Sequence, residues 1–243
     1  MEGKHLQILA LENSSSMYYN CVVTFSIVLL AIAYTHSNKI YADVGCKDFF
    51  SDGDTFKYIS FSKRMEHNNV HLLSAETLPW KPLAVTFVYV ANDVFAMSVN
   101  IMKPYARLSP GSSLLVRIFN YSLSRACRAV ENVFGILSVK FSAFSKPVTL
   151  HPSKIQTVVL TCIYLHNFLH RNISSRNFYS PPGSFGLEDM ENHTIIPGTW
   201  RSEIEDKHGL INLQNVQRRS LNVAQSIRNE LQEYFILTEG SVS

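Results

Sequence analysis

The stretch IFNYSLSRACRAVENVFGIL, from Ile118 to Leu137, decides how this chain is expected to fold. Its apolar residues recur at intervals of three and four, which is the spacing of one face of an α-helix. We predict a helix over about residues 112–137 that packs on a sheet through Leu123, Ala126, Val130, Val133 and Leu137. Glu131 falls at the edge of this stripe, so its side chain is expected to be half-buried.

Strands are expected ahead of this helix, because several segments there are rich in β-branched and aromatic residues with turn residues between them. The three earliest cover residues 6–11, 22–33 and 39–44. A turn at residues 51–54 should start a short helix that ends near Glu66. The run from Leu83 to Ala91 is continuously apolar and is typical of a strand buried on both faces.

Two more helices are predicted behind the first. One begins near Pro152 and continues through Leu169, and the other is an amphipathic helix that uses Ala224, Ile227, Leu231 and Phe235. Residues 172–217 show no period and are expected to be irregular. The order of elements predicts an α/β domain with a mixed sheet flanked by helices over residues 1–171, followed by a C-terminal extension over 172–243.

Composition excludes few function classes. The chain has 243 residues, 46% of them hydrophobic, and a net charge of +3, which is compatible with nucleic acid without demanding it. The apolar run at 22–33 is shorter than the ~20 residues of a membrane-spanning helix, so no membrane role is expected. Four widely separated cysteines form no metal-binding or disulfide pattern; they are Cys21, Cys46, Cys127 and Cys162. A reducing compartment, nucleus or cytoplasm, is expected.

The amino-acid sequence resembles those of Harbinger-type (PIF/Harbinger) transposases of the DDE superfamily. Residues 118–137 are similar to the signature helix of that family, and further similar blocks occur at 43–46, 51–53, 102–105 and 165–169. The start at Gly3-Lys4-His5 is similar to the first strand of the family. The resemblance implies an RNase H-like fold and a DNA endonuclease that cleaves phosphodiesters with divalent Mg or Mn.

In such a site two Asp and one Glu hold two metal ions, because hard cations prefer carboxylate oxygens. The first acid falls on Glu2, where the family has Asp, and the second on Asn92, where the family usually has Asp. The third is Glu131, which matches and lies 39 residues after Asn92. Asp93 could stand in for Asn92 only if the strand twists or slips by one residue, because neighbouring strand residues point to opposite faces.

Two functions therefore compete: a metal-dependent nuclease with a degenerate site, and an inactive transposase relic that binds DNA or protein. Read without the family, Glu131 is a helix acid paired with Arg128 one turn away. Asp52 and Asp54 are expected in a turn. His5 and His166 are expected to be hydrogen-bonded structural residues.

DNA is the expected partner. Basic residues near the proposed acids could neutralise its phosphates; these are Lys103, Arg107, Arg117, Arg125 and Arg128. The resemblance also implies a Myb-like partner protein. The family usually carries a helical DNA-binding region ahead of the first strand, which this sequence is expected to lack.

Overall fold

The computed structural model describes residues 1–9, 24–34, 40–46, 60–67, 72–78, 84–106, 111–189, 194–204, 208–214 and 220–236. The chain divides into two compact units. The first unit joins Met1–Ile59 to Arg128–Gln214, and the second joins Ser60–Cys127 to Asn215–Ser243. The boundary expected at residue 171 stays a prediction. The turn predicted at 51–54, with Asp52 and Asp54, lies outside the described residues.

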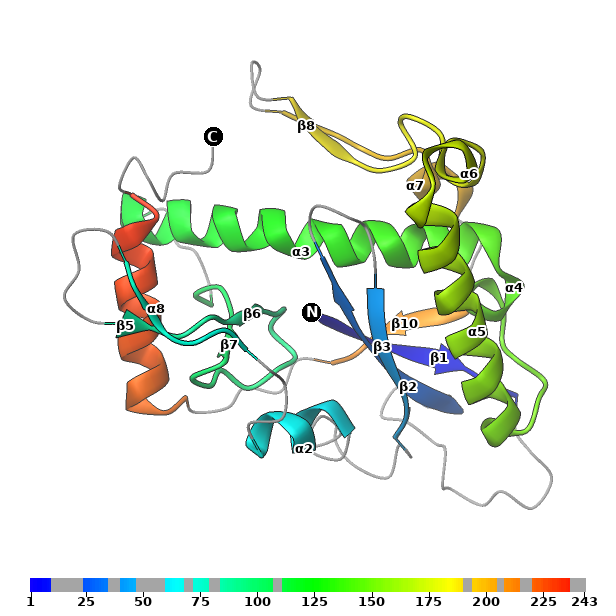
Figure 1. Ribbon diagram of the computed structural model, residues 1–243, viewed down its shortest axis with the longest axis horizontal. Coiled ribbons are helices and arrows are strands. Elements are labelled where there is room, and N and C mark those ends of the chain that lie inside the picture. Colours follow the sequence, from blue (N-terminus) through cyan, green and yellow to red (C-terminus); the bar gives the residue numbers. More distant parts are fainter. Residues whose placement is uncertain are drawn as a thin grey trace. The chain divides into compact units, whose positions relative to one another are not determined.

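The first unit is built on a four-stranded sheet in the order β10-β1-β2-β3 (Figure 1). Its strands are β1 (Glu2–Gln7), β2 (Ser26–Ala33), β3 (Ile40–Cys46) and β10 (Leu210–Asn212). All three pairings are antiparallel, so the prediction of a mixed sheet is wrong for this sheet. The reason is local: β1, β2 and β3 follow one another closely along the chain, so each returns beside its predecessor. The apolar run predicted as a strand at 22–33 is the buried strand β2 where it is described.

Helices pack on one face of this sheet. They are the second half of α3 (Leu114–Lys140), the short α4 (Ser142–Ser145) and α5 (Pro152–Arg171). The core between helices and sheet includes Leu29, Ala31, Val133, Leu137 and Ile155, all fully buried. The helices predicted from periodicity therefore lie where expected. Among the described residues, no helix is long and apolar enough to cross a membrane.

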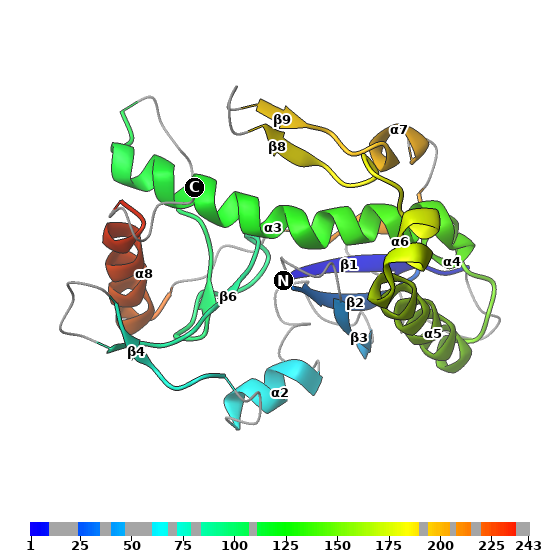
Figure 2. The same cartoon turned by 45° about the horizontal axis from the view of Figure 1, so that its top comes forward.

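Residues 172–217 contain regular structure, which corrects the prediction that they are irregular. They form α6 (Ile173–Tyr179), the hairpin of β8 (Leu187–Asp189) and β9 (Thr194–Ile196), α7 (Trp200–Glu203) and β10. These elements are short, so they carry too few residues to show a period. Figure 2 shows the hairpin beside α3, where Arg128 of α3 forms a 2.8 Å ion pair with Glu188 of β8.

The second unit contains α2 (Ser60–Glu66), β4 (Glu76–Thr77), β5 (Ala84–Val85), β6 (Tyr89–Val90), β7 (Ile101–Met102), the first half of α3, and α8 (Asn222–Tyr234). Its core includes Met102 and Phe119, against which Ile227 and Leu231 of α8 and Phe235, just after α8, pack. Tyr105 fixes α8 further, because its hydroxyl donates to Gln232 at 2.7 Å and its ring lies 3.8 Å from the Arg228 guanidinium.

The continuous strand predicted at 83–91 is wrong. Within it only β5 and β6 are strands, and they belong to separate two-stranded sheets, one with β4 and one with β7. Phe87, between them, is exposed. Apolar content alone cannot tell a strand buried on both faces from two short strands joined by an exposed residue.

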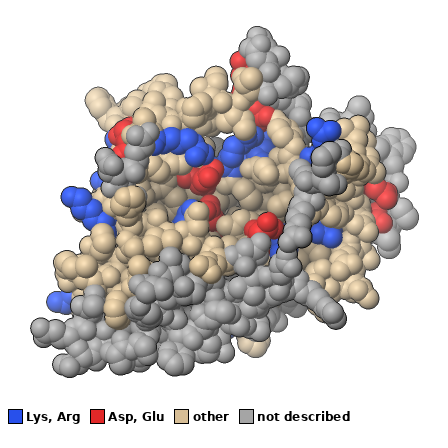
Figure 3. Space-filling model, turned by 180° about the vertical axis from the view of Figure 1, so that it is seen from behind, with Lys and Arg blue, Asp and Glu red and all other residues tan. Residues whose placement is uncertain are grey.

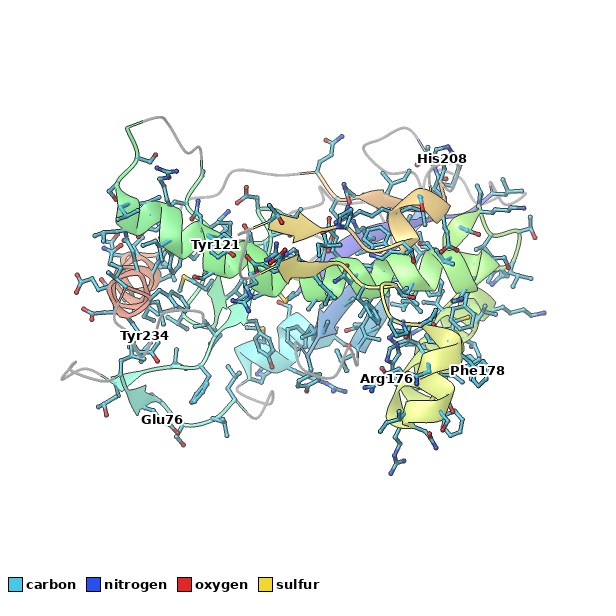
Figure 4. All side chains as sticks on the ribbon, turned by 90° about the horizontal axis from the view of Figure 1, so that it is seen from above. Glu76, Tyr121, Arg176, Phe178, His208 and Tyr234 are labelled. Carbon is cyan, nitrogen blue, oxygen red and sulfur yellow. The ribbon has the colours of Figure 1, made fainter. Side chains whose placement is uncertain are left out.

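Histidines lie at the junction of α5 and α6. His166 is fully buried and shares a 3.0 Å hydrogen bond with the Tyr179 hydroxyl, and His5 shares a 2.9 Å bond with Ser26, so both are structural as expected. The His166 and His170 rings are 4.6 Å apart. Burial, followed by the nearby charges of His166 and Arg176, lowers the pKa of His170 from 6.5 to about 4. Arg176 and Phe178 lie on opposite sides of α6 (Figure 4).

This pKa shift predicts acid sensitivity. Between pH 6.5 and about 4 the unfolded chain takes up a proton at residue 170 that the folded chain does not. The free energy of unfolding should therefore fall as pH drops through that window. We expect a fall of about 2 kcal/mol, less than the full pKa shift would give, because the nearby hydroxyl of Ser180 partly solvates the imidazolium cation. Urea unfolding at a series of pH values measures it. His170→Gln should flatten this part of the profile, whereas the exposed His208 (Figure 4), changed to Gln, should leave it intact.

Candidate metal site

Strand register places Glu2 and Lys4 on the face of the sheet that carries α3. Glu2 lies opposite Ala31 and Lys4 opposite Leu29 in the β1–β2 pairing. Residues directly opposite each other in an antiparallel pair share a face. Ala31 and Leu29 are buried in the core under α3. Both polar side chains of β1 therefore point toward the helix that carries Glu131.

Lys4 lies at the centre of this region. Its Nζ is 2.7 Å from Glu2 Oε1, with the side chains of Lys4 and Glu2 only 14% and 12% exposed. The same amine donates to Asn212 of β10 and lies 5.7 Å from the centre of the Phe134 ring. A largely buried acid and amine such as these stabilise each other's charge, since either one alone would be costly to bury.

Lys4 also lines a cavity of about 220 Å³ that Glu131 shares. The other lining residues are Phe134, Gly135, Ser138, Trp200, Arg201, Ile204 and Leu210. The Glu131 side chain is 43% exposed, so the half-buried acid predicted from the helix pattern is confirmed. Its partner is Arg201 at 3.1 Å, so the predicted pairing with Arg128 is wrong. Lys4 is thus paired with Glu2 and lines the same cavity as Glu131.

Trp200 anchors the wall of this cavity. The residue is 4% exposed, and its indole N–H donates to Asn132 Oδ1 at 3.0 Å. The ring lies directly against Gly135, where a side chain would have no room. The Arg201 guanidinium stacks on the same ring at 4.4 Å. Sequence reasoning missed both residues; the available signal was a glycine in the interior of a long apolar helix, which indicates close approach by another group.

Asn92 and Asp93 belong to the second unit and follow β6. Asn92 Oδ1 is buried and has no hydrogen-bond partner in the part of the chain that the structure describes. The Asp93 carbonyl accepts a 3.4 Å hydrogen bond from Lys103. Convergence of these two residues with Glu2 and Glu131 stays a prediction. A buried amide oxygen without a partner is an unusual feature, because such groups are nearly always satisfied.

The predicted ligands carry carboxylate and amide oxygens, which are the atoms that Mg²⁺ and Mn²⁺ prefer. The described residues contain no group of three or more His, Cys, Asp or Glu arranged to hold a metal. Glu2 and Glu131 are instead each paired with a basic side chain, Lys4 and Arg201 respectively.

The family described as DDE superfamily endonuclease matches residues 1–167. The chain belongs to this family. DDE superfamily endonucleases generally use divalent metal ions, and Glu2, Asn92, Asp93 and Glu131 all lie within the matched residues. Trp200 and Arg201 lie beyond them. No curated protein and no solved structure matches the chain.

The basic side chains expected to contact DNA differ in their surroundings in this DDE superfamily endonuclease. On the face drawn in Figure 3, Lys and Arg side chains lie beside Asp and Glu side chains. Arg128 pairs with Glu188, and Arg117 is exposed on α3. Arg107 lies outside the described residues. Cys127 and Cys162 are free thiols and are half-buried.

Proposed function

We propose that the chain is a divalent-metal-dependent DNA endonuclease of the transposase type, of the Harbinger subtype, with an RNase H-like arrangement. One observation carries the proposal: Glu2 of the first strand forms an ion pair with Lys4, and Lys4 lines the same cavity as Glu131 of α3 in the first unit. Charged side chains from three segments of the first unit, Lys4, Glu131 and Arg201, therefore meet at this cavity.

Each residue has a proposed role. Glu2 and Glu131 hold divalent ions, and Asn92 or Asp93 completes the set. When bound, such ions activate water and stabilise the leaving oxygen of a phosphodiester. Lys4 and Arg201, released from their acids, are positioned to pair with DNA phosphate oxygens, which they favour as charged donors. A Myb-like partner and a nuclear or cytoplasmic location are further proposals, supported by the resemblance and by cysteine usage.

The alternative is an inactive relic that binds DNA or protein. It is favoured by the chemistry of the acids: both glutamates are already neutralised by ion pairs, and Asn92 brings no charge. In that case the fold persists while the site no longer holds two ions.

Nicking of supercoiled plasmid distinguishes the two functions. With Mn²⁺, the full chain should nick DNA, and Glu131→Gln should slow nicking by about two orders of magnitude, because a bound ion stabilises the transition state by several kcal/mol. Glu76→Gln is the matched control, since Glu76 is exposed on β4 (Figure 4); it should nick like the wild type. Equal rates for wild type and Glu131→Gln would leave the relic as the function.

A further inference from the structure

Arg201 holds the position that a cation would take at Glu131. Its Nη2 donates to Glu131 Oε2 at 3.1 Å. A divalent ion bound to the same carboxylate would lie within a few Å of the guanidinium, and two positive charges at that distance repel. The Arg201–Glu131 pair therefore lowers the affinity of this carboxylate for a metal ion.

The pair is weak, but Arg201 is held in place. Both side chains are nearly half exposed, 47% for Arg201 and 43% for Glu131, and pairs of this kind contribute little to stability. By contrast, the neighbouring Trp200 is buried, is bonded to Asn132 and carries the Arg201 guanidinium on its ring. An arginine anchored through its neighbour stays close to the acid even when a ligand displaces it.

We propose that Arg201 is a built-in counter-ion that occupies Glu131 in the metal-free protein and sets the affinity of this acid for metal ions. The segment that carries it lies beyond the family-matched residues 1–167. The proposal rests on the proposed function in one respect, that Glu131 is a metal ligand. Arg201 is a positioning residue here and takes no part in bond cleavage.

Terbium luminescence tests it directly. Tb³⁺ takes oxygen ligands as Ca²⁺ does, and its emission is sensitised by a nearby tryptophan; Trp200 lines the cavity with Glu131. The chain has two tryptophans, so the titration uses the full chain with Trp80→Phe and an excitation wavelength that tyrosine does not absorb, which leaves Trp200 as the sole sensitiser. Arg201→Gln should bind Tb³⁺ about five- to tenfold more tightly at low ionic strength, because a repelling charge is gone.

Salt dependence separates an electrostatic role from a structural one. The difference between wild type and Arg201→Gln should shrink as ionic strength rises, since salt screens charges near the surface. Arg201→Lys should bind Tb³⁺ like the wild type. Arg171→Gln removes the same charge from an exposed site outside the cavity and should leave the affinity unchanged.

Three results would overturn the proposal: sensitised emission that persists in Glu131→Gln, an Arg201→Gln affinity equal to or weaker than that of the wild type, and no emission from any variant. Plasmid nicking with Mn²⁺ is scored separately. Tight Tb³⁺ binding in Arg201→Gln, together with no nicking by the wild type, supports the counter-ion and contradicts the nuclease. Nicking that depends on Glu131, with unchanged Tb³⁺ affinity in Arg201→Gln, supports the nuclease and contradicts the counter-ion.

Discussion

Asn92→Asp is expected to raise the rate of Mn²⁺-dependent plasmid nicking by about a hundredfold, a change of roughly 3 kcal/mol in the barrier. The substitution keeps the shape of the side chain and adds the charge that divalent ions favour. Since Asn92 Oδ1 is buried and has no partner among the described residues, the new carboxylate meets no existing hydrogen bond that it must break.

The metal-free variant should show the cost of that charge. Burying an unpaired carboxylate costs more than burying a neutral amide, so the melting temperature of Asn92→Asp should fall without metal and recover when Mn²⁺ is added. Asp93→Asn, made both in the wild type and in Asn92→Asp, is the matched control for the change at Asn92. If Asp93→Asn abolishes nicking while Asn92→Asp changes nothing, Asp93 is the second ligand and the assignment of Asn92 is wrong.

Gly135→Ala is expected to lower the free energy of unfolding by about 3 kcal/mol. A methyl group at this position would lie 2.7 Å from Trp200 Cε2 and closer still to two other ring carbons. Because the ring is buried and bonded to Asn132, it cannot move aside cheaply. The gain of about 1 kcal/mol in helix propensity from Gly to Ala is too small to compensate.

Urea unfolding measures this effect, with Gly111→Ala as control. A methyl group at Gly111 would meet nothing within 4 Å, so that variant should unfold like the wild type. If Gly135→Ala proves as stable as the wild type, Trp200 is not packed on α3 as described, and the position of Arg201 beside Glu131 loses its support.

Periodicity predicted the long helices because each buries a regular apolar face. α3, α5 and α8 lie where the spacing of their apolar residues predicted them. Each buries a residue of its predicted apolar face, which is Val133 in α3, Ile155 in α5 and Ala224 in α8. The strand predicted at 83–91 failed because its apolar residues serve two short sheets. β10 was missed because a three-residue strand has no pattern of its own; it forms only where β1 offers its unpaired edge.

The candidate site was predictable only in part. The position of Glu131 at the edge of its helix stripe follows from helix geometry, whereas Glu2 was assigned only from the resemblance to the family. The orientation of Lys4 toward the face of the sheet that carries α3 depends on strand register, which sequence spacing does not give. Arg201 pairs with Glu131 across 70 residues of chain, and no local pattern predicts a contact at that separation.

The edge position of β10 affects how the protein is made. During synthesis the β1 edge emerges early, whereas β10, which covers it, emerges about 200 residues later. At ordinary translation rates the nascent chain waits roughly ten to forty seconds with that edge bare. An uncovered strand edge is a template for pairing with other chains, so chaperone supply and ribosome speed should affect the yield of soluble protein.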